Sequence, residues 1–545
     1  MKNTFKYLSS FLVLVVTLLI NQSCSKPFEE VNAILTNVEI HHGVNVQIMD
    51  ANPAATNPYP SNPVVTLEGD AVDQGLIYST AGELLTTAPG SAAVVNSRVS
   101  LAVKPLTIIS ATKPLRFYIK AEAANYISNT KEIVITSLDS LQTVKLPLLK
   151  IASLPSGVAI KTAQATAVAG ELSSNFNVNV VSTTPGTPAA ETTVTATFPA
   201  TTDFKDATGK VITTAGNFNI DVVGFNAASS EAATSLPGGL TVEAADGTPA
   251  TIVLAGAVDI NASIGGSDIK SFSEPIPFTL KLSPTVFNPS TNATLKVGDQ
   301  LPVYSKNDNS VLWVRESTAD IVSDGTGGLK VTMQVTHLST WMVGFIVTQC
   351  ASDLKLNYIS NNDEPIIAIV NVNVKGGNKQ LVTTKTVTVK NGEDIVLNLP
   401  KDLAFTITAF DASSTSTVPF STIDVAACAT SGTIRNNVVS ANPSLSFDLE
   451  TQCADGKFRY SGPIEFKVAG TNVWRPFTAS EGGKLTTKLL EWNKTYDFRI
   501  IYRDVAYVRS RNVLQAEFRQ VGNVWEFFGK TAEKQTFFTT PTSCL

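Results

Sequence analysis

Apolar and polar residues alternate along most of the chain with a period of two, which is typical of β-strands that bury one face. The alternation is clear at residues 117–121 (FYIKA), 218–222 (FNIDV) and 370–374 (VNVNV). Clusters of Gly, Pro, Asn and Asp interrupt these runs, as turns between strands require. No segment carries the apolar spacing of an amphipathic helix longer than a few turns. The pattern therefore predicts a mainly β protein.

Length and composition extend this prediction from strands to domains. The chain has 545 residues, which is too long for one ordinary hydrophobic core. Apolar residues make up 43% and charged residues only 16%, a balance typical of a folded rather than a disordered chain. We therefore expect several consecutive immunoglobulin-like or transthyretin-like β-sandwich domains in an elongated chain.

The order of strand runs and turn clusters divides the chain into segments. We expect a signal peptide at 1–23, a tether at 24–33, and β-sandwich domains at 34–151, 152–347, 348–446 and 447–545. The last two domains begin with similar sequences, TQCASD at 348–353 and TQCAD at 451–455. This similarity predicts an internal repeat.

The N-terminal segment has the layout of an export signal. Lys2 and Lys6 precede an apolar run at 11–20 that is too short to span a bilayer stably. Together with Cys24, this layout resembles the signal of a Bacteroidota-type lipoprotein, which implies that Cys24 is acylated and becomes the first mature residue. The sequence departs from that pattern at Asn21, where an aliphatic residue is usual. The alternative is a plain secretory signal followed by an ordinary thiol.

An acidic pair, Glu29 and Glu30, follows Cys24 closely. It resembles the surface-export signal of Bacteroidota lipoproteins, which implies an outer-membrane lipoprotein displayed at the cell surface. The same residues also fit a solvated tether that holds the protein on the periplasmic face. In either orientation the membrane is the expected partner of the N-terminal lipid, since two or more acyl chains give stable anchoring.

Four further cysteines lie in the C-terminal part of the chain, at Cys350, Cys428, Cys453 and Cys544. They form no CxxC motif and no cluster with histidine, so we expect no metal site, and no cofactor motif is present. In an exported chain, four cysteines indicate two disulfides. We favour one bond per repeat, Cys350 with Cys428 and Cys453 with Cys544, over pairing between the repeats.

Residues 190–347 carry an ordered series of short motifs. They are TVTATFPATT at 193–202, VGDQLPVYS at 297–305, WVRE at 313–316 and VTHLSTW at 335–341. Their order resembles the β-sandwich domains related to ZU5 and GAIN, and the similar ectodomains of cartilage intermediate layer protein. The resemblance implies a β-sandwich in which the His-Leu-Ser tripeptide forms a turn between the last strands.

That tripeptide, His337-Leu338-Ser339, is the sharpest candidate for chemistry. In autoproteolytic GAIN- and ZU5-type domains such a histidine acts as base and the hydroxyl attacks the preceding carbonyl. The resemblance would make His337 the base, Ser339 the nucleophile and Leu338–Ser339 the bond that is cut. The other interpretation is a tight turn, with Trp341 filling the core. We favour the turn. The chain has only three histidines, and this low number argues against most enzymes that use acid–base catalysis.

The C-terminal repeat differs from the rest in charge and aromatic content. From residue 453 to 545 it has seven Lys and seven Arg against nine Asp and Glu. Arginine and aromatic residues are enriched at interaction surfaces, so this repeat is the candidate recognition end. The residues proposed for binding are Trp474, Trp492, Arg499, Arg503 and Trp525. The alternative is that the aromatic residues build a small core and the arginines keep it soluble.

These observations lead to one expected function and one alternative. We expect a non-catalytic, lipid-anchored cell-envelope protein whose β-sandwich modules serve binding, adhesion or assembly, with an unidentified protein or glycan ligand. The alternative is an autoproteolytic envelope protein that cleaves at Leu338–Ser339. The net charge of −5 is too small to steer the whole molecule toward nucleic acid, so we expect no nucleic-acid partner.

Overall fold

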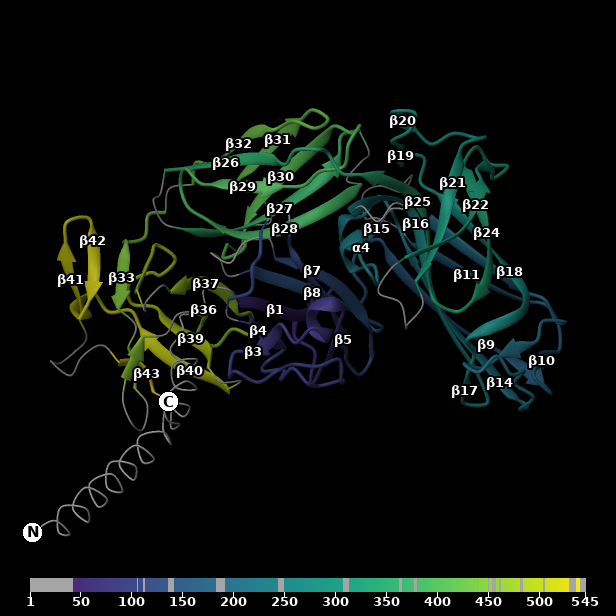
Figure 1. Ribbon diagram of the computed structural model, residues 1–545, viewed down its shortest axis with the longest axis horizontal. Helices are drawn as coiled ribbons and strands as arrows, with labels where there is room; N and C mark the ends of the chain where they lie inside the picture. The colour runs from purple at the N-terminus through teal and green to yellow at the C-terminus, as the bar shows by residue number, and fades with distance from the viewer. Residues whose placement is uncertain are drawn as a thin grey trace, which may run out of the picture.

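The computed structural model confirms the mainly β fold class, because paired strands and turns fill most of the described chain (Figure 1). The structure describes residues 43–104, 106–110, 113–135, 142–182, 192–243, 249–306, 313–361, 365–376, 380–414, 416, 418–438, 440–448, 450–452, 457–459, 462–480, 484–502, 505–528 and 536–539. Four successive sets of strands are named here module 1 (43–150), module 2 (158–348), module 3 (354–436) and module 4 (445–539).

Module 1 is a sandwich of two sheets with strand orders β3-β4-β1-β8-β6 and β2-β5-β7. Its elements are β1 (Gly43–Asp50), β2 (Val64–Glu68), α3 (Asp70–Asp73), β3 (Ile77–Ser79), β4 (Arg98–Val103), β5 (Leu115–Glu122), β6 (Tyr126–Ile127), β7 (Asn129–Ile135) and β8 (Gln142–Lys150). The predicted alternation holds in β5, where Phe117, Ile119 and Ala121 are buried and the residues between them are more exposed. The inward residues of both sheets form one core.

Module 2 is the largest sandwich, and its main sheets have the orders β10-β9-β14-β16-β25-β21-β22 and β11-β12-β18-β24-β23. Its elements are β9 (Val158–Val168), β10 (Glu171–Leu172), β11 (Phe176–Ser182), β12 (Thr192–Phe198), β13 (Phe204–Lys205), β14 (Gly216–Phe225), α4 (Ser230–Ser235), β15 (Thr241–Glu243), β16 (Pro249–Ile264), β17 (Ser267–Asp268), β18 (Ser271–Leu282), β19 (Phe287–Asn288), β20 (Ala293–Thr294), β21 (Gln300–Lys306), β22 (Val314–Asp320), β23 (Val322–Ser323), β24 (Leu329–His337) and β25 (Thr340–Thr348). Phenylalanine rings fill its core; Phe218 lies 5.0 Å from Phe204 and 5.4 Å from Phe198 between ring centres.

Modules 3 and 4 are smaller sandwiches. Module 3 contains β26 (Leu354–Ser360), β27 (Ile366–Val374), β28 (Leu381–Val389), β29 (Asp394–Leu397), β30 (Phe405–Asp411), β31 (Ser421–Val425) and β32 (Ser431–Asn436). Module 4 contains β33 (Leu445–Asp448), β34 (Glu450–Gln452), β35 (Lys457–Arg459), β36 (Gly462–Val468), β37 (Arg475–Ser480), β38 (Lys484–Thr487), β39 (Thr495–Tyr502), β40 (Val505–Asn512), η2 (Gln515–Glu517), β41 (Phe518–Val521), β42 (Val524–Phe527) and β43 (Thr536–Thr539).

Three modules share one topological feature, a parallel pair made by an early and a late strand. In module 1, β1 pairs with β8; in module 3, β26 pairs with β32; in module 4, β33 pairs with β42. In modules 1 and 3 the same early strand is flanked on its other side by an antiparallel strand, β4 or β29. Because the two parallel strands run the same way, the chain enters such a module at one end and leaves it at the other.

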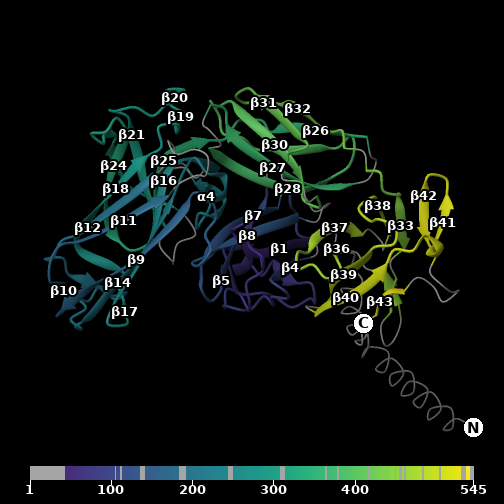
Figure 2. The same ribbon diagram turned by 180° about the vertical axis from the view of Figure 1, so that it is seen from behind.

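The modules pack against one another in space. Modules 2 and 3 share a continuous apolar core, and the buried side chain of Gln380 joins them by donating to Leu254 O at 2.7 Å and accepting from Phe287 N at 3.0 Å. Module 1 meets module 2 where Gly238 N donates to Asn129 Oδ1 at 3.2 Å. Figures 1 and 2 show module 1 beneath module 3, with module 2 on one side and module 4 on the other.

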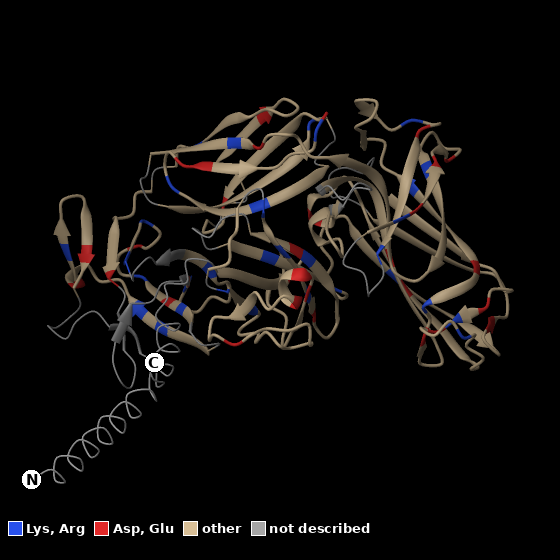
Figure 3. Cartoon of the chain, in the orientation of Figure 1, with Lys and Arg blue, Asp and Glu red and all other residues tan. Residues whose placement is uncertain are grey.

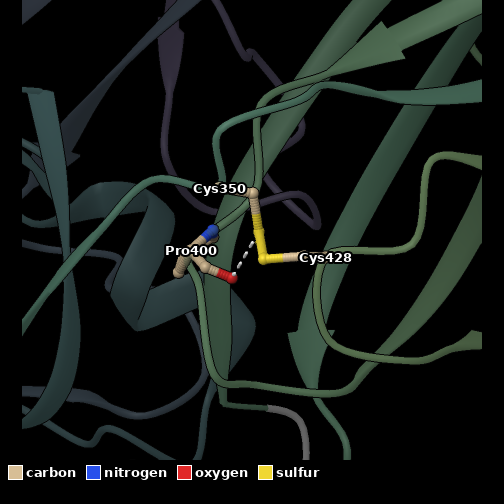
Figure 4. The surroundings of a disulfide bond; sticks show 3 residues. All are labelled: Cys350, Pro400 and Cys428. Atoms are coloured by element: carbon tan, nitrogen blue, oxygen red, sulfur yellow. Dashed lines mark hydrogen bonds between the residues drawn. A yellow bond between two sulfur atoms is a disulfide. The ribbon is translucent and has the colours of Figure 1, made fainter.

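The predicted bond between Cys350 and Cys428 is confirmed, with Cα atoms 5.5 Å apart (Figure 4). It ties the connector before β26 to the loop between β31 and β32. Cys350 N also donates to Leu399 O at 2.8 Å, and its Sγ contacts the carbonyl oxygen of Pro400 at 3.5 Å. The disulfide therefore fastens the start of module 3 to a loop beside its last strand.

Removal of this bond is expected to weaken module 3. The double variant Cys350→Ser, Cys428→Ser frees a loop with a sequence separation of 78 in the unfolded chain, so the free energy of unfolding should fall by about 2–4 kcal/mol. Denaturant titration followed by circular dichroism measures the change. Wild-type protein treated with a reductant should unfold at the same denaturant concentration as the double variant; an unchanged midpoint for both would contradict the prediction.

Candidate functional site

The His337-Leu338-Ser339 segment forms an arch between the two sheets of module 2. His337 ends β24 in one sheet, and Thr340 begins β25 in the other. Leu338 N donates to Lys270 O at 2.9 Å, and Ser339 O accepts from Ile260 N at 3.2 Å. The arch is thus hydrogen-bonded to both sheets, and neither Leu338 nor Ser339 has a positive φ. The sequence-based prediction of a turn here is confirmed.

The side chains of the arch bond to groups other than one another. Ser339 is buried, and its Oγ lies 3.5 Å from Thr340 O. The Nδ1 of His337 lies 3.1 Å from the hydroxyl of Thr336, and its ring packs 4.9 Å from that of Trp341. Trp341 is fully buried and donates its indole N–H to His337 O at 3.1 Å.

The electrostatics of His337 follow from its burial. Partial burial lowers the pKa of this imidazole, and the Glu316 carboxylate opposes the shift more weakly. Its Nε2 is buried and has no hydrogen-bond partner among the described residues, which suits a neutral ring with an unused lone pair. A neutral His337 packed on Trp341 holds the arch in place. The hydroxyl of Ser339 makes its contact elsewhere, so this geometry supports a structural role.

Two of the residues predicted for binding, the buried Arg499 and the partly buried Trp474, lie at the contact between modules 4 and 1. Arg499 is 4% exposed, and its guanidinium carbon lies 4.3 Å from the ring centre of Trp474. Trp492 and Trp525 are partly buried against the module 4 core, with ring centres 5.5 Å apart. Arg503 lies outside the described residues. The same holds for Cys24, Cys453 and Cys544, so the acylation site and the second predicted disulfide stay predictions.

A buried set of three charged residues joins modules 1 and 4. Glu465 of β36 accepts a hydrogen bond on Oε1 from Arg98 Nη2 of β4 and one on Oε2 from Arg499 Nε of β39, the latter at 2.9 Å. All three residues are 3–4% exposed. Buried charges are tolerated only when paired and hydrogen-bonded, and here one carboxylate serves two guanidinium groups. The contact between the modules depends on this carboxylate.

Tyr59 and Trp474 extend this contact. The Tyr59 hydroxyl donates to Trp474 O at 3.0 Å and accepts from Gln47 Nε2 at 3.1 Å. Burial raises the pKa of Tyr59 despite the nearby arginines, so the phenol is neutral near pH 7. Burial also lowers the pKa of Arg499 to about 10, which leaves it charged at neutral pH. Sequence patterns did not single out Arg98, Glu465 or Tyr59, since each looks like an ordinary surface residue of a strand or loop.

An open cleft of about 430 Å³ lies between modules 1 and 2. Its polar and aromatic lining comes from Lys120, Glu122 and Tyr126 of module 1 and from Asp221 and Asn261 of module 2. Most of these polar groups are already paired. Lys120 and Glu122 form an ion pair at 2.7 Å, and Asp221 accepts from the hydroxyl of Thr162 at 2.5 Å.

Tyr126 supplies an aromatic ring to the wall of this cleft. Its hydroxyl donates to Asp50 Oδ2 at 3.4 Å, and burial together with that carboxylate raises the pKa of Tyr126 to about 12. Asn261 donates from Nδ2 to Asp259 Oδ2 at 3.0 Å, a bond that uses its amide N–H and not its amide oxygen. The cleft therefore combines one neutral phenol, one amide oxygen and charges of both signs.

The residues that the structure describes contain no group of three or more His, Cys, Asp or Glu able to hold a metal ion. Within the same residues, no helix has the length and apolar character of a membrane-spanning segment. Figure 3 shows Lys, Arg, Asp and Glu interspersed over all four modules rather than gathered by sign.

No protein-family model matches the chain, and no curated protein matches its sequence. Among solved structures it is similar to the Bacillus anthracis TIE protein, with 10% identity over 89% of this chain and 73% of the other and a TM-score of 0.15. It is also similar to BcpA, the major pilin subunit of Bacillus cereus, with 12% identity over 73% of this chain and 99% of the other and a TM-score of 0.13. A streptococcal ancillary pilin gives 12% identity over 46% and 94%, and a TM-score of 0.14. Values this low carry no conclusion about what this chain binds or does.

Neutralising the shared carboxylate is expected to separate modules 1 and 4. Glu465→Gln leaves Arg98 and Arg499 buried beside each other without their counter-charge, which should cost about 3–5 kcal/mol. Denaturant titration measures the free energy of unfolding, and small-angle X-ray scattering should show a larger radius of gyration.

The matched control for this prediction is Glu491→Gln in the same module. Glu491 pairs with Lys494 at the surface, where both side chains are almost half exposed, so its loss should cost at most about 1 kcal/mol. Equal effects of the two substitutions, or an unchanged radius of gyration for Glu465→Gln, would show that the buried carboxylate does not hold the modules together.

Proposed function

We propose that this chain is a non-catalytic, lipid-anchored cell-envelope protein whose β-sandwich modules present a binding surface close to the membrane. The observation that carries the proposal is the buried contact of Arg98, Glu465 and Arg499, which folds the last module back onto the first. The first module is also the one that continues the N-terminal tether, since β1 begins at Gly43. The four modules are thereby held as one arrangement next to the proposed anchor.

The disulfide supports an extracytoplasmic location. Bonds such as Cys350–Cys428 form and persist in oxidising compartments and are rare where thiols are kept reduced. The export signal that precedes Cys24 in the sequence agrees with this location. We propose an outer-membrane lipoprotein facing the cell exterior, with the acidic pair Glu29 and Glu30 as the feature that favours this orientation.

We propose a glycan as the ligand of the cleft between modules 1 and 2. The wall includes Tyr126, Asn261 and the paired charges of Lys120 and Glu122. An aromatic face with a few fixed polar groups suits a neutral, hydroxyl-rich molecule, whereas mixed charges disfavour a strongly ionic one. The partly buried pair Trp492 and Trp525 on module 4 is a further contact surface for a protein partner.

Intact mass measurement of the protein purified from its own envelope tests the anchor and the alternative function together. We expect one species that begins at an acylated Cys24, and Cys24→Ser should move the protein from the membrane fraction to the soluble fraction. An unmodified N-terminus would refute the anchor. A fragment that begins at Ser339 and disappears in Ser339→Ala would establish autoproteolysis instead.

Blocking the cleft should abolish ligand binding. Asn261→Trp places a bulky ring in the cleft, so glycan binding, measured on arrays of envelope polysaccharides, should fall by about tenfold or more, a loss of about 1.4 kcal/mol or more. The control is Asn177→Trp, an exposed position on β11 of the same module, which should bind as the wild type does. Equal binding by both variants would place the ligand elsewhere.

A further inference from the structure

The loop that follows β4 carries the two most exposed large apolar side chains of the described residues. Leu106 is 99% exposed and Ile108 is 80% exposed, whereas the neighbouring Ile109 packs against the module 1 core. Exposed single apolar residues are common, but two bulky aliphatic residues at one loop tip are a feature of interaction sites. The pair therefore projects to solvent from a loop whose next residue, Ile109, is partly buried against the core.

Hydrogen bonds hold the described residues of this loop, 104, 106–110 and 113. Thr107 Oγ1 donates to Lys104 O at 2.6 Å, and Ser110 and Lys113 exchange two backbone hydrogen bonds at 3.1 Å. Leu106 has a φ of +65°, a conformation that bulky side chains rarely adopt. A strained backbone that displays an apolar side chain to solvent indicates a function for that side chain rather than a contribution to the fold.

The loop leaves module 1 at the same end as the tether. β1 and β4 are antiparallel, and Gly43, the first described residue after the tether, lies opposite Ala102. Lys104 is only two residues beyond Ala102, or about 7 Å along the strand direction. The 18 residues between Cys24 and Gly43 span at most about 60 Å, so an acylated Cys24 keeps this end of module 1 near the bilayer.

The charge of the loop also favours the bilayer as its binding partner. Lys104 and Lys113 flank the apolar tip, and both are exposed. Basic side chains beside exposed aliphatic residues suit a phospholipid surface, where acyl chains lie beneath anionic phosphates. Protein–protein interfaces, by contrast, are depleted of lysine.

We propose that Leu106 and Ile108 insert into the bilayer that holds the acyl chains of Cys24, with Lys104 and Lys113 on its phosphates. This inference rests on the proposed lipid anchor. The loop acts as a second contact that sets the orientation of module 1 on the membrane, since a single flexible attachment fixes distance but not direction.

Fluorescence quenching by brominated lipids tests the proposal in the full lipidated chain. Leu106→Trp keeps an apolar side chain at the tip, and Val418→Trp is the control at a 72% exposed position of module 3. In vesicles of phosphatidylethanolamine and phosphatidylglycerol, bromination of the acyl chains should quench roughly half or more of the fluorescence added at position 106, because quenching requires contact with the acyl region. Fluorescence added at position 418 should be unaffected.

A second measurement separates this inference from the anchor. Mature chain with Cys24→Ser has no lipid, so its weak partition onto the same vesicles reports the loop alone. Leu106→Ser with Ile108→Ser should lower that partition by about tenfold or more. The control pair Val418→Ser, Val438→Ser removes two other exposed apolar side chains, 72% and 64% exposed, from module 3 and the following connector and should leave the partition unchanged.

The outcomes are distinct. Failure of the wild-type chain to float with vesicles would refute the anchor, while the Cys24→Ser comparison would still decide the role of the loop. Equal quenching at positions 106 and 418, or equal partition of the two serine double variants, would refute insertion of the loop even if the anchor holds. Absence of quenching at position 106 would point to a protein partner for the tip.

Discussion

The arrangement of this protein depends on one carboxylate that neutralises two buried guanidinium groups. Glu465 lies between Arg98 of module 1 and Arg499 of module 4, in a contact that excludes water from all three. Taking charges out of water is costly, and the cost is offset only when each charge keeps a partner in good geometry. The modules must therefore meet in one register, because a shift of even one strand residue would leave a buried charge unpaired.

The strand pattern predicted which way these residues point but not what covers them. In β36, Ile464 and Phe466 face the module 4 core, so Glu465 between them must face away from that core. The same alternation in β39 turns Phe498 and Ile500 into the module 4 core and Arg499 to the opposite face. Alternation predicts on which side of the sheet a side chain lies. It does not predict whether that side is exposed, because a second module can cover it. Without an observation that pairs distant segments, the burial of Glu465 and Arg499 could not be predicted.

Local features were predicted better than long-range ones for the same reason. The repeated TQC sequence identified the Cys350–Cys428 bond because both cysteines belong to one repeat, and the resemblance to ZU5- and GAIN-type domains implied the turn at His337. The parallel pairing of β1 with β8 and of β26 with β32 could not be predicted from the sequence. The apolar and polar pattern of a strand is the same whether its neighbours run parallel or antiparallel to it. The cleft at Tyr126 was missed because its walls come from two modules.

Strand β4 links the two contacts that position the molecule. Its first residue, Arg98, holds module 4, and its last residue, Val103, leads into the loop that carries Leu106 and Ile108. A strand of six residues is about 20 Å long, so module 4 is held only that far from the end of module 1 where the tether begins. If that end lies on the membrane, the last module of the chain also lies close to it. Distance along the sequence therefore says little about distance from the envelope, because the contact of β4 with module 4 and the start of β1 are separated by only one strand length.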